Sequence, residues 1–298
     1  MNKRVQAWLV AGAAAIVYAN TLANGFVYDD RFYVVGNAAV TGYSLAQILR
    51  PMTNGVFHLF RPVTIASLAA NWEIGGPRPF GFHLVNILLH AAVALLLYFV
   101  LRKLLEELPQ GANIAFAAAL LFAVHPIHTE AVAWITGRSE LRTTGFLLAA
   151  WLLHLQDRPV GAMVCFALAL FSKESGVVFL PLIAAGDYAR GKFKPLSRYA
   201  WICGVTALYV ALVWKVQGGR FDKGPYSWLD NPLANLPAVW RILNALRVAW
   251  KYVGLQLYPA KLSCDYSYNA IHLYADWKHT LPVVAATLLV VGAWIWTA

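Results

Sequence analysis

Charged residues are scarce in this sequence. Only 13% of its 298 residues are Asp, Glu, Lys or Arg, and 60% are hydrophobic, with Tyr and Cys included. Soluble globular domains carry about 25% charged and about 45–50% apolar residues, because water has to solvate their surface. The composition therefore excludes an ordinary soluble domain and predicts a protein that lies in lipid. The 12 Trp and 14 Tyr residues supply amphipathic rings of the kind that gather at membrane interfaces.

Cysteine spacing, basic runs and repeats are also lacking. The three Cys residues follow no regular spacing, which argues against a disulfide scaffold or a metal knuckle. The formal charge of +10 comes from Lys and Arg scattered in short segments, so no basic arm points to nucleic acid. No internal period of about 34 residues is visible, and we expect no TPR domain in this chain.

Apolar runs set the predicted architecture. They cover residues 5–23, 84–101, 112–124, 141–156, 160–172, 176–186, 199–216 and 281–296. At 1.5 Å per residue the first run is long enough to cross a bilayer, with a cleaved signal peptide as the alternative. We therefore predict an all-α polytopic membrane protein, a single transmembrane domain over 1–298 with a large first extracytoplasmic loop at 24–83.

Two of the runs are interrupted by polar residues. Pro126 should stop or kink the helix after 112–124, which leaves the following polar cluster near membrane depth. Lys173 and Glu174 separate 160–172 from 176–186, either inside one long helix or between two short ones. The basic segment 187–198 is typical of a cytoplasmic loop, and this favours the hairpin of two short helices.

The segment 239–258 is ambiguous. Arg241, Arg247 and Lys251 interrupt an apolar run at spacings that place them roughly on one helical face. An amphipathic helix at the membrane interface fits this pattern, and a span that lines a cavity is the alternative.

Adjacent carboxylates follow the first apolar run. Asp29 and Asp30 could serve as a general base for an acceptor hydroxyl, or they could bind a divalent cation. A solvated turn or a helix cap is the structural alternative. Arg61 follows an apolar and aromatic patch, where it could clamp a phosphate with two parallel hydrogen bonds or simply extend to the interface.

Further polar residues occur near membrane depth, where charge is costly and points to function. His125, His128 and Glu130 lack the HExxH spacing of a zinc site, so substrate hydrogen bonding is favoured over metal binding, with a buried structural network as the alternative. Arg138 and Glu140 could pair with each other, or with Glu130 and Lys173.

Two more candidates complete the set. Lys173 could reach a lipid phosphate while Glu174 orients it, and a self-neutralising turn is the alternative. Asp265 and Tyr266 suit a ligand rich in hydroxyl groups, and a purely structural role is the alternative. No metal ligand set is predicted among these residues.

Several ordered pieces of the chain resemble one family. They are NGFVYDD at 24–30, FRP at 60–62, HPIHTEAVAW at 125–134, GRSEL at 137–141, SKESG at 172–176, DNP at 230–232 and YPAKLSCDYS at 258–267. In this order they resemble the transmembrane-and-TPR protein O-mannosyltransferases, which belong to the GT-C glycosyltransferase superfamily. The resemblance covers most of residues 20–270 and implies a GT-C-like helical bundle.

The resemblance also implies an activity. The donor would be a mannosyl-type sugar on a dolichyl or undecaprenyl phosphate, and the acceptor a Ser or Thr hydroxyl of a translocated protein. The acidic pair, Asp29 and Asp30 here, would carry catalysis on the extracytoplasmic face of a bacterial inner membrane or an ER membrane. The remaining candidates would bind substrate. No cofactor is assigned, and a divalent cation could bind at the acidic pair. A transporter or flippase of lipid-linked sugar, or a non-catalytic membrane scaffold, are the alternative functions.

Overall fold

The structure is a computed structural model that describes residues 1–298 apart from 43, 54–57, 193–195, 220–230, 267–269 and 298. The chain divides into two compact units, Met1–Lys223 and Gly224–Ala298. The expectation of one membrane domain over the whole length stays a prediction.

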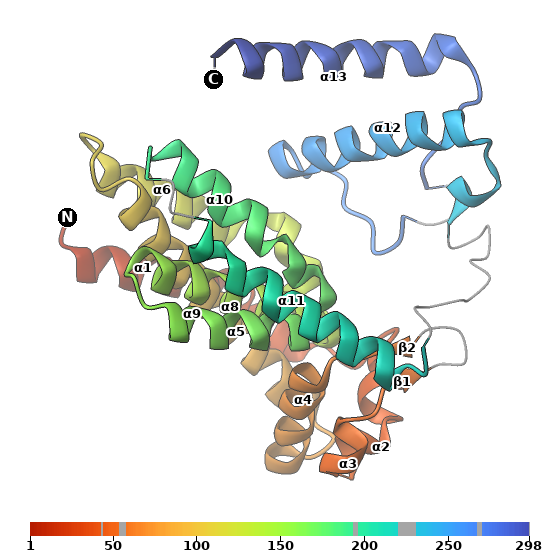
Figure 1. Cartoon of the computed structure of the whole chain (residues 1–298). Coiled ribbons are helices and arrows are strands. Elements are labelled where there is room, and N and C mark those ends of the chain that lie inside the picture. The colour runs from red at the N-terminus through yellow and green to blue at the C-terminus, as the bar shows by residue number, and fades with distance from the viewer. Residues whose placement is uncertain (43, 54–57, 193–195, 220–230, 267–269, 298) are drawn as a thin grey trace. The chain divides into compact units, whose positions relative to one another are not determined.

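Helices make up nearly all regular structure in the first unit (Figure 1). The longer ones are α1 Lys3–Val17, α4 Pro62–Gly75, α5 Pro79–Leu104, α6 Gly111–Val124, α8 Arg138–Leu155, α9 Pro159–Ser172, α10 Phe179–Ala189 and α11 Ser197–Val216. The short ones are α2 Ala38–Thr41, α3 Leu45–Ile48 and α7 Thr129–Ala133. Strands β1 Met52–Thr53 and β2 His58–Leu59 form one small antiparallel pair. The helical class is confirmed, while the GT-C-like arrangement stays a prediction.

Proline positions explain several helix boundaries. Pro62, Pro79 and Pro159 begin α4, α5 and α9, where the first turn does not need their missing amide proton. Pro126 follows the end of α6, and the chain bends by 47° between Gly111–Val124 and Pro126–Ala133. The polar residues after this bend thus leave the axis of α6.

Some helices are long and apolar enough to cross a membrane. Among the described residues these are Lys3–Ala23, Pro79–Leu104 and Tyr199–Val216, with the bent pair around Pro126 as a fourth. Helix α9 and the segment Trp277–Ala293 are apolar but shorter. The chain is therefore a membrane protein, and the predicted number of crossings stays a prediction.

Helices α1, α5 and α6 pack through small side chains. Ala14, Ala94, Ala115, Ala119 and Ala123 are fully buried in one cluster. Small residues let helix backbones approach closely, which is the usual source of helix attraction within lipid. At one end of this contact the Tyr98 hydroxyl donates to Gln6 Oε1 at 2.7 Å, so α1 and α5 run antiparallel.

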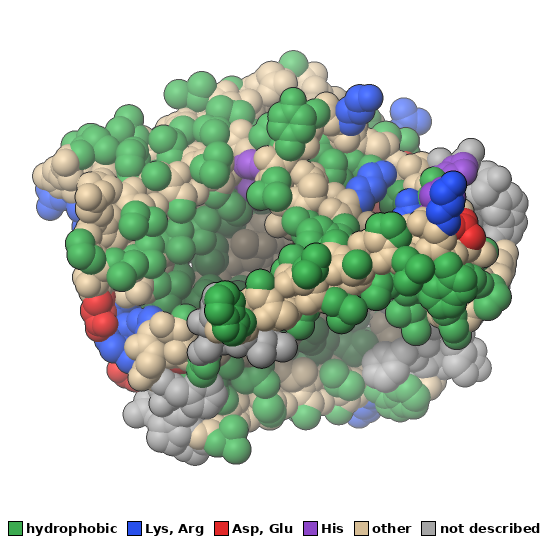
Figure 2. Space-filling model, turned by 90° about the horizontal axis from the view of Figure 1, so that it is seen from above, with side chains coloured by type: hydrophobic (Ala, Val, Ile, Leu, Met, Phe, Trp, Pro, Cys, Tyr) green, Lys and Arg blue, Asp and Glu red, His purple; other side chains and the backbone are tan. Residues whose placement is uncertain are grey.

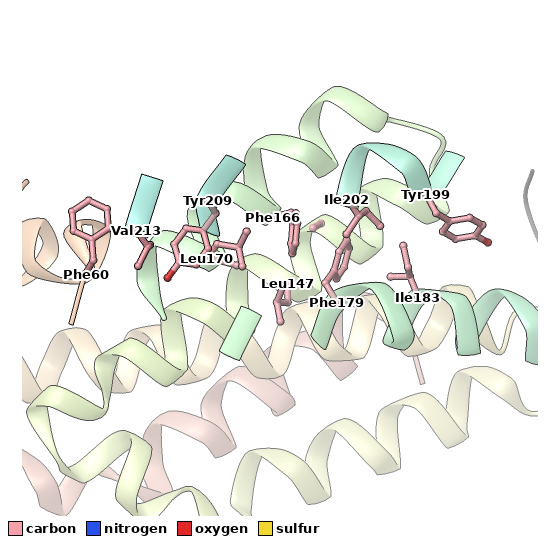
Figure 3. Close-up of a cluster of buried hydrophobic side chains, with 12 residues drawn as sticks. Phe60, Leu147, Phe166, Leu170, Phe179, Ile183, Tyr199, Ile202, Tyr209 and Val213 are labelled. Atoms are coloured by element: carbon pink, nitrogen blue, oxygen red, sulfur yellow. The ribbon is translucent and has the colours of Figure 1, made fainter. Parts of the chain in front are cut away.

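Aromatic and branched side chains fill a second core between α8, α9, α10 and α11 (Figure 3). Phe166 of α9 stacks on Phe179 of α10 with ring centroids 5.1 Å apart. Lys173, in an extended conformation, and the 3-10 helix η5 Glu174–Val178 separate the two helices. The region is therefore built from two short helices, as the hairpin alternative proposed, and Lys173 and Glu174 lie where the chain reverses.

Polar contacts hold the bundle at the end of α8, α10 and α5. His154 Nε2 lies 2.8 Å from Asp187 Oδ2, and the Tyr199 hydroxyl donates to the same oxygen at 2.7 Å. All three side chains are buried. Lys192 pairs with Glu107, which follows the C-terminal end of α5. These contacts hold the end of the first unit where α8 ends, and they involve no residue from the start of α8.

The second unit contains η6 Pro232–Asn235, α12 Ala238–Leu257 and α13 Trp277–Thr297. Basic residues of α12 contact aromatic rings of the following loop. The Arg247 guanidinium lies 4.1 Å from the Tyr274 ring centroid, and Lys251 Nζ lies 4.6 Å from that of Tyr266. Helix α12 is not among the described helices that are apolar enough to span a membrane. Its predicted place at the interface stays a prediction.

Large apolar side chains remain exposed on the outside. Trp8 is 78% exposed and Ile74 is 87% exposed. Figure 2 shows hydrophobic side chains over much of the visible face, with few charged groups among them. Exposed apolar surface of this extent marks contact with lipid or another protein.

Candidate active site

A cavity of about 310 Å³ lies in the first unit, and distant segments of the chain line it. Its charged lining residues are Asp29, Arg61, Glu130, Glu140 and Lys173. They come from the first loop, the start of α4, α7, the start of α8 and the end of α9. The structure thus brings five of the predicted site residues to one place. In contrast, His125, His128, Arg138 and Glu174 do not belong to the lining.

The two adjacent acids have different environments. Tyr28, the residue before them, has a left-handed φ of 46°, which is uncommon for a residue with a side chain. The Asp29 carboxylate is open to the cavity, whereas Asp30 is fully buried. Burial raises the pKa of Asp29 above its usual range. No described residue is hydrogen-bonded to its carboxylate, so Asp29 is available to a ligand.

Asp30 instead holds two loops together. The Val27 amide donates to Asp30 Oδ2 at 3.1 Å, and the Thr136 amide donates to Oδ1 at 3.0 Å. Burial raises the pKa of Asp30, and these two amides act in the opposite direction. With both oxygens engaged by the backbone, Asp30 fixes the first loop against the turn before α8. The contacts of Asp30 are those of a positioning residue, and its predicted catalytic role stays a prediction.

The chain between α7 and α8 approaches itself closely. A Cβ atom on Gly137 would lie 2.7 Å from the Glu130 carbonyl oxygen and 2.8 Å from that of Ala131. Only glycine fits this approach without a shift of the backbone. Glu130 is exposed at the cavity, and its carboxylate has no hydrogen-bond partner among the described residues. The Glu130 carboxylate is the second lining acid that a ligand could meet directly.

Both lining cations are paired with carboxylates. Arg61 donates through Nε to Glu174 Oε2 at 3.0 Å and through Nη2 to Oε1 at 2.5 Å. Lys173 donates to Glu140. The Thr64 hydroxyl, one turn into α4, donates to the Ser172 carbonyl at 2.9 Å and holds the start of α4 against the end of α9. Lys173 and Glu174 therefore do not pair with each other as predicted. Each forms an ion pair with a residue of another helix, Lys173 with Glu140 and Glu174 with Arg61.

Arg138 is a structural residue. Its side chain is fully buried, and its nitrogens donate to four oxygens at 2.8–3.1 Å. These acceptors are Asn86 Oδ1, Asn71 Oδ1 and the carbonyls of Ser67 and Phe82. The guanidinium therefore joins α4, α5 and α8, and the pairing with Glu130 or Glu140 that the sequence suggested does not occur. Because every one of these donors is engaged, a role in binding phosphate has no support here.

The two histidines of the HPIHTE segment belong to an aromatic cluster. His128 lies between Phe122 and His90, with ring centroids 4.1 and 5.3 Å apart. His125 Nδ1 accepts from the Ile127 amide at 3.3 Å, and its carbonyl accepts from the Tyr18 hydroxyl. The structural alternative thus fits both residues better than substrate binding. Among the described residues, no group of three His, Cys, Asp or Glu could hold a metal ion.

Asp265 and Tyr266 belong to the second unit, so their role stays a prediction. A divalent cation at the acidic pair also stays untested, although Asp30 has both oxygens bound to amides. Tyr33 lines the cavity, and sequence reasoning missed it. Burial and the negative charge of Asp29 raise the pKa of Tyr33, and its position four residues after Asp29 in a helical turn was the available signal.

Comparison with known proteins identifies similar chains. The family model for Protein O-mannosyl-transferase TMTC, DUF1736, matches residues 220–293. A protein O-mannosyl-transferase of Caenorhabditis elegans is 33% identical over 95% of this chain and 43% of its own length. Protein O-mannosyl-transferase Tmtc1 of Drosophila melanogaster is 33% identical over 88% of this chain and 34% of its own.

A mammalian protein is also similar to this chain. Protein O-mannosyl-transferase TMTC3 of Mus musculus is 30% identical over 89% of this chain and 33% of its own length. The chain therefore spans less than half the length of these curated relatives. No solved structure matches the chain.

Proposed function

Because the chain belongs to the family of TMTC protein O-mannosyl-transferases, we propose that it forms the membrane part of a glycosyltransferase. The donor is a mannosyl-type sugar on a polyprenyl phosphate, and the acceptor is a Ser or Thr hydroxyl of a protein. We place the cavity at the extracytoplasmic face of a multi-pass protein, in a bacterial inner membrane or an ER membrane.

One observation carries this proposal: a free carboxylate shares a small cavity with two cations. The Asp29 carboxylate has no hydrogen-bond partner among the described residues, and burial raises its pKa. A general base works best when its pKa approaches the working pH, so this shift favours proton transfer. Arg61 and Lys173 supply positive charge where a leaving phosphate would gain negative charge.

The proposed reaction exchanges one bond to the anomeric carbon for another. Asp29 takes the proton of the acceptor hydroxyl, and that oxygen forms a bond to the anomeric carbon of the sugar. The bond between this carbon and the phosphate oxygen breaks, and the lipid phosphate leaves with the electron pair. Positive charge that develops on the sugar ring is stabilised by Asp29 and Glu130, which face the same cavity.

The other lining groups position the reactants. Tyr33 is held neutral by its raised pKa and can donate a hydrogen bond to a sugar hydroxyl. Trp134 also lines the cavity, while its indole nitrogen is buried and has no acceptor among the described residues. The Trp134 ring therefore offers an apolar surface, and Tyr33 offers a ring with one polar atom, both of which suit a sugar.

The test is transfer of radiolabelled mannose from a polyprenyl phosphate to Ser- and Thr-containing peptides by the purified protein. Asp29→Asn keeps the shape of the side chain and removes the base, so the rate should fall by about 10²–10⁴. Glu107→Gln removes a carboxylate beyond the other end of α5 and should leave the rate unchanged. An Asp29→Asn protein that transfers mannose at the normal rate would remove the base from this scheme.

A further inference from the structure

Two crossed ion pairs meet at the reversal between α9 and α10. Lys173 and Glu174 are consecutive, and the extended backbone at Lys173 sends their side chains in different directions. Lys173 pairs with Glu140 at the start of α8, and Glu174 pairs with Arg61 at the start of α4. The two consecutive residues Lys173 and Glu174 therefore form ion pairs with two different cavity residues, Glu140 and Arg61.

These pairs leave the cavity short of positive charge. Its described lining holds three carboxylates, Asp29, Glu130 and Glu140, against the two cations Arg61 and Lys173. Both cations already face a carboxylate. An incoming phosphate would find no unpaired cation among the described lining residues, so one of the carboxylates has to give way before it can bind.

Glu174 is the carboxylate best placed to leave. It lies outside the lining of the cavity, and its side chain is 51% exposed, against 16% for Arg61. Its two oxygens occupy two donors of the Arg61 fork, in the parallel arrangement that a phosphate also prefers. Solvent can take up the released carboxylate, while Arg61 stays in place.

We propose that Glu174 is a built-in competitor of the donor phosphate. In the empty site it holds the Arg61 fork in position and neutralises it. A phosphate that carries an isoprenoid chain displaces Glu174 and takes over both hydrogen bonds. After transfer, return of Glu174 to Arg61 helps to release the lipid phosphate. Glu174 is thus a positioning residue that acts through Arg61. The identity of the ligand rests on the proposed function, whereas the competition itself does not.

Binding of a short isoprenyl phosphate tests this inference directly. Radiolabelled farnesyl phosphate serves as the probe, and farnesol, which lacks the phosphate, measures binding of the chain alone. Glu174→Gln removes the competing charge, so the Kd for farnesyl phosphate should fall by about 2–5-fold, the size of one half-exposed ion pair. The Kd for farnesol should not change.

Two further variants isolate the pair. Arg61→Ala should weaken binding of farnesyl phosphate, and Glu174→Gln should have no effect in the Arg61→Ala background. Glu174→Asp keeps the charge and should bind much as the unaltered protein does. Glu107→Gln removes an equivalent paired carboxylate outside the cavity and serves as the matched control.

Kinetics supply a readout that a purely structural role would not move. Glu174→Gln should lower KM for the lipid donor and increase inhibition by the lipid phosphate product. If Glu174→Gln does not fold, as its unfolding temperature will show, Glu174→Ala carries the same expectation.

Unchanged or weaker binding of farnesyl phosphate to a folded Glu174→Gln or Glu174→Ala protein would overturn the competition. So would tighter binding that persists without Arg61. If instead the proposed function is wrong, the unaltered protein will bind farnesyl phosphate through Arg61 but will transfer no sugar.

Discussion

Replacement of Arg138 by lysine separates a structural arginine from a substrate-binding one. The Arg138 fork donates to four oxygens on α4 and α5, and the side chain is fully buried. Lysine keeps the positive charge but offers three donors on a single nitrogen. Arg138→Lys therefore leaves one or two buried acceptors without a donor.

The cost follows from these lost contacts. A buried polar group that loses its partner costs about 1–3 kcal/mol. One or two such groups predict a loss of roughly 2–4 kcal/mol in the free energy of unfolding. For a unit of this size each kcal/mol corresponds to a shift of about 2–4 °C, so the unfolding temperature should fall by roughly 5–15 °C.

Thermal unfolding of the detergent-purified protein measures this effect. Arg142→Lys is the matched control, since Arg142 lies one turn further along α8 and its guanidinium lies over the Phe146 ring, 5.5 Å from the ring centroid. The control should lower the unfolding temperature much less. An Arg138→Lys protein as stable as the control, but with weaker binding of an isoprenyl phosphate, would refute the structural role and restore the predicted contact with substrate.

Two further predictions follow from the cavity. Burial raises the pKa of Asp29, and a general base must be ionised to accept a proton. In a pH-rate profile, kcat/KM should therefore rise with pH along an acidic limb whose midpoint lies above about 3.9, the ordinary pKa of Asp. A lower midpoint would contradict this prediction. Gly137→Ala should reduce both mannosyl transfer and the unfolding temperature, since the new Cβ would lie 2.7 Å from the Glu130 carbonyl oxygen. A transfer assay and a thermal scan measure the two effects. Unchanged values in both would show that the turn relaxes to accept the Cβ.

Much of the site could be predicted from the sequence because charge is rare in it. In an apolar chain a charged group near lipid is costly unless other polar groups surround it. The polar segments that contain Asp29, Arg61, Glu130 and Lys173 were therefore candidates for the site, and these four residues line one cavity. The break at Pro126 follows from proline chemistry in the same way.

The sequence could not assign partners within these segments. Asp29 and Asp30 are chemically identical neighbours. The left-handed backbone at Tyr28 and the contacts of Asp30 with the Val27 and Thr136 amides distinguish the open carboxylate from the buried one. Asp265 and Tyr266 lie in the second unit, where the structure leaves their predicted role untested.

The sequence by itself determined that this chain lies in a membrane and which short segments carry its chemistry, since composition and apolar run length depend on no tertiary contact. The tertiary structure alone decided which cation meets which acid. It buried Arg138 among neutral oxygens and paired Arg61 with Glu174, 113 residues away. The reason is that the free energy of a charged group depends on the donors and acceptors around it, and in this fold distant segments provide them.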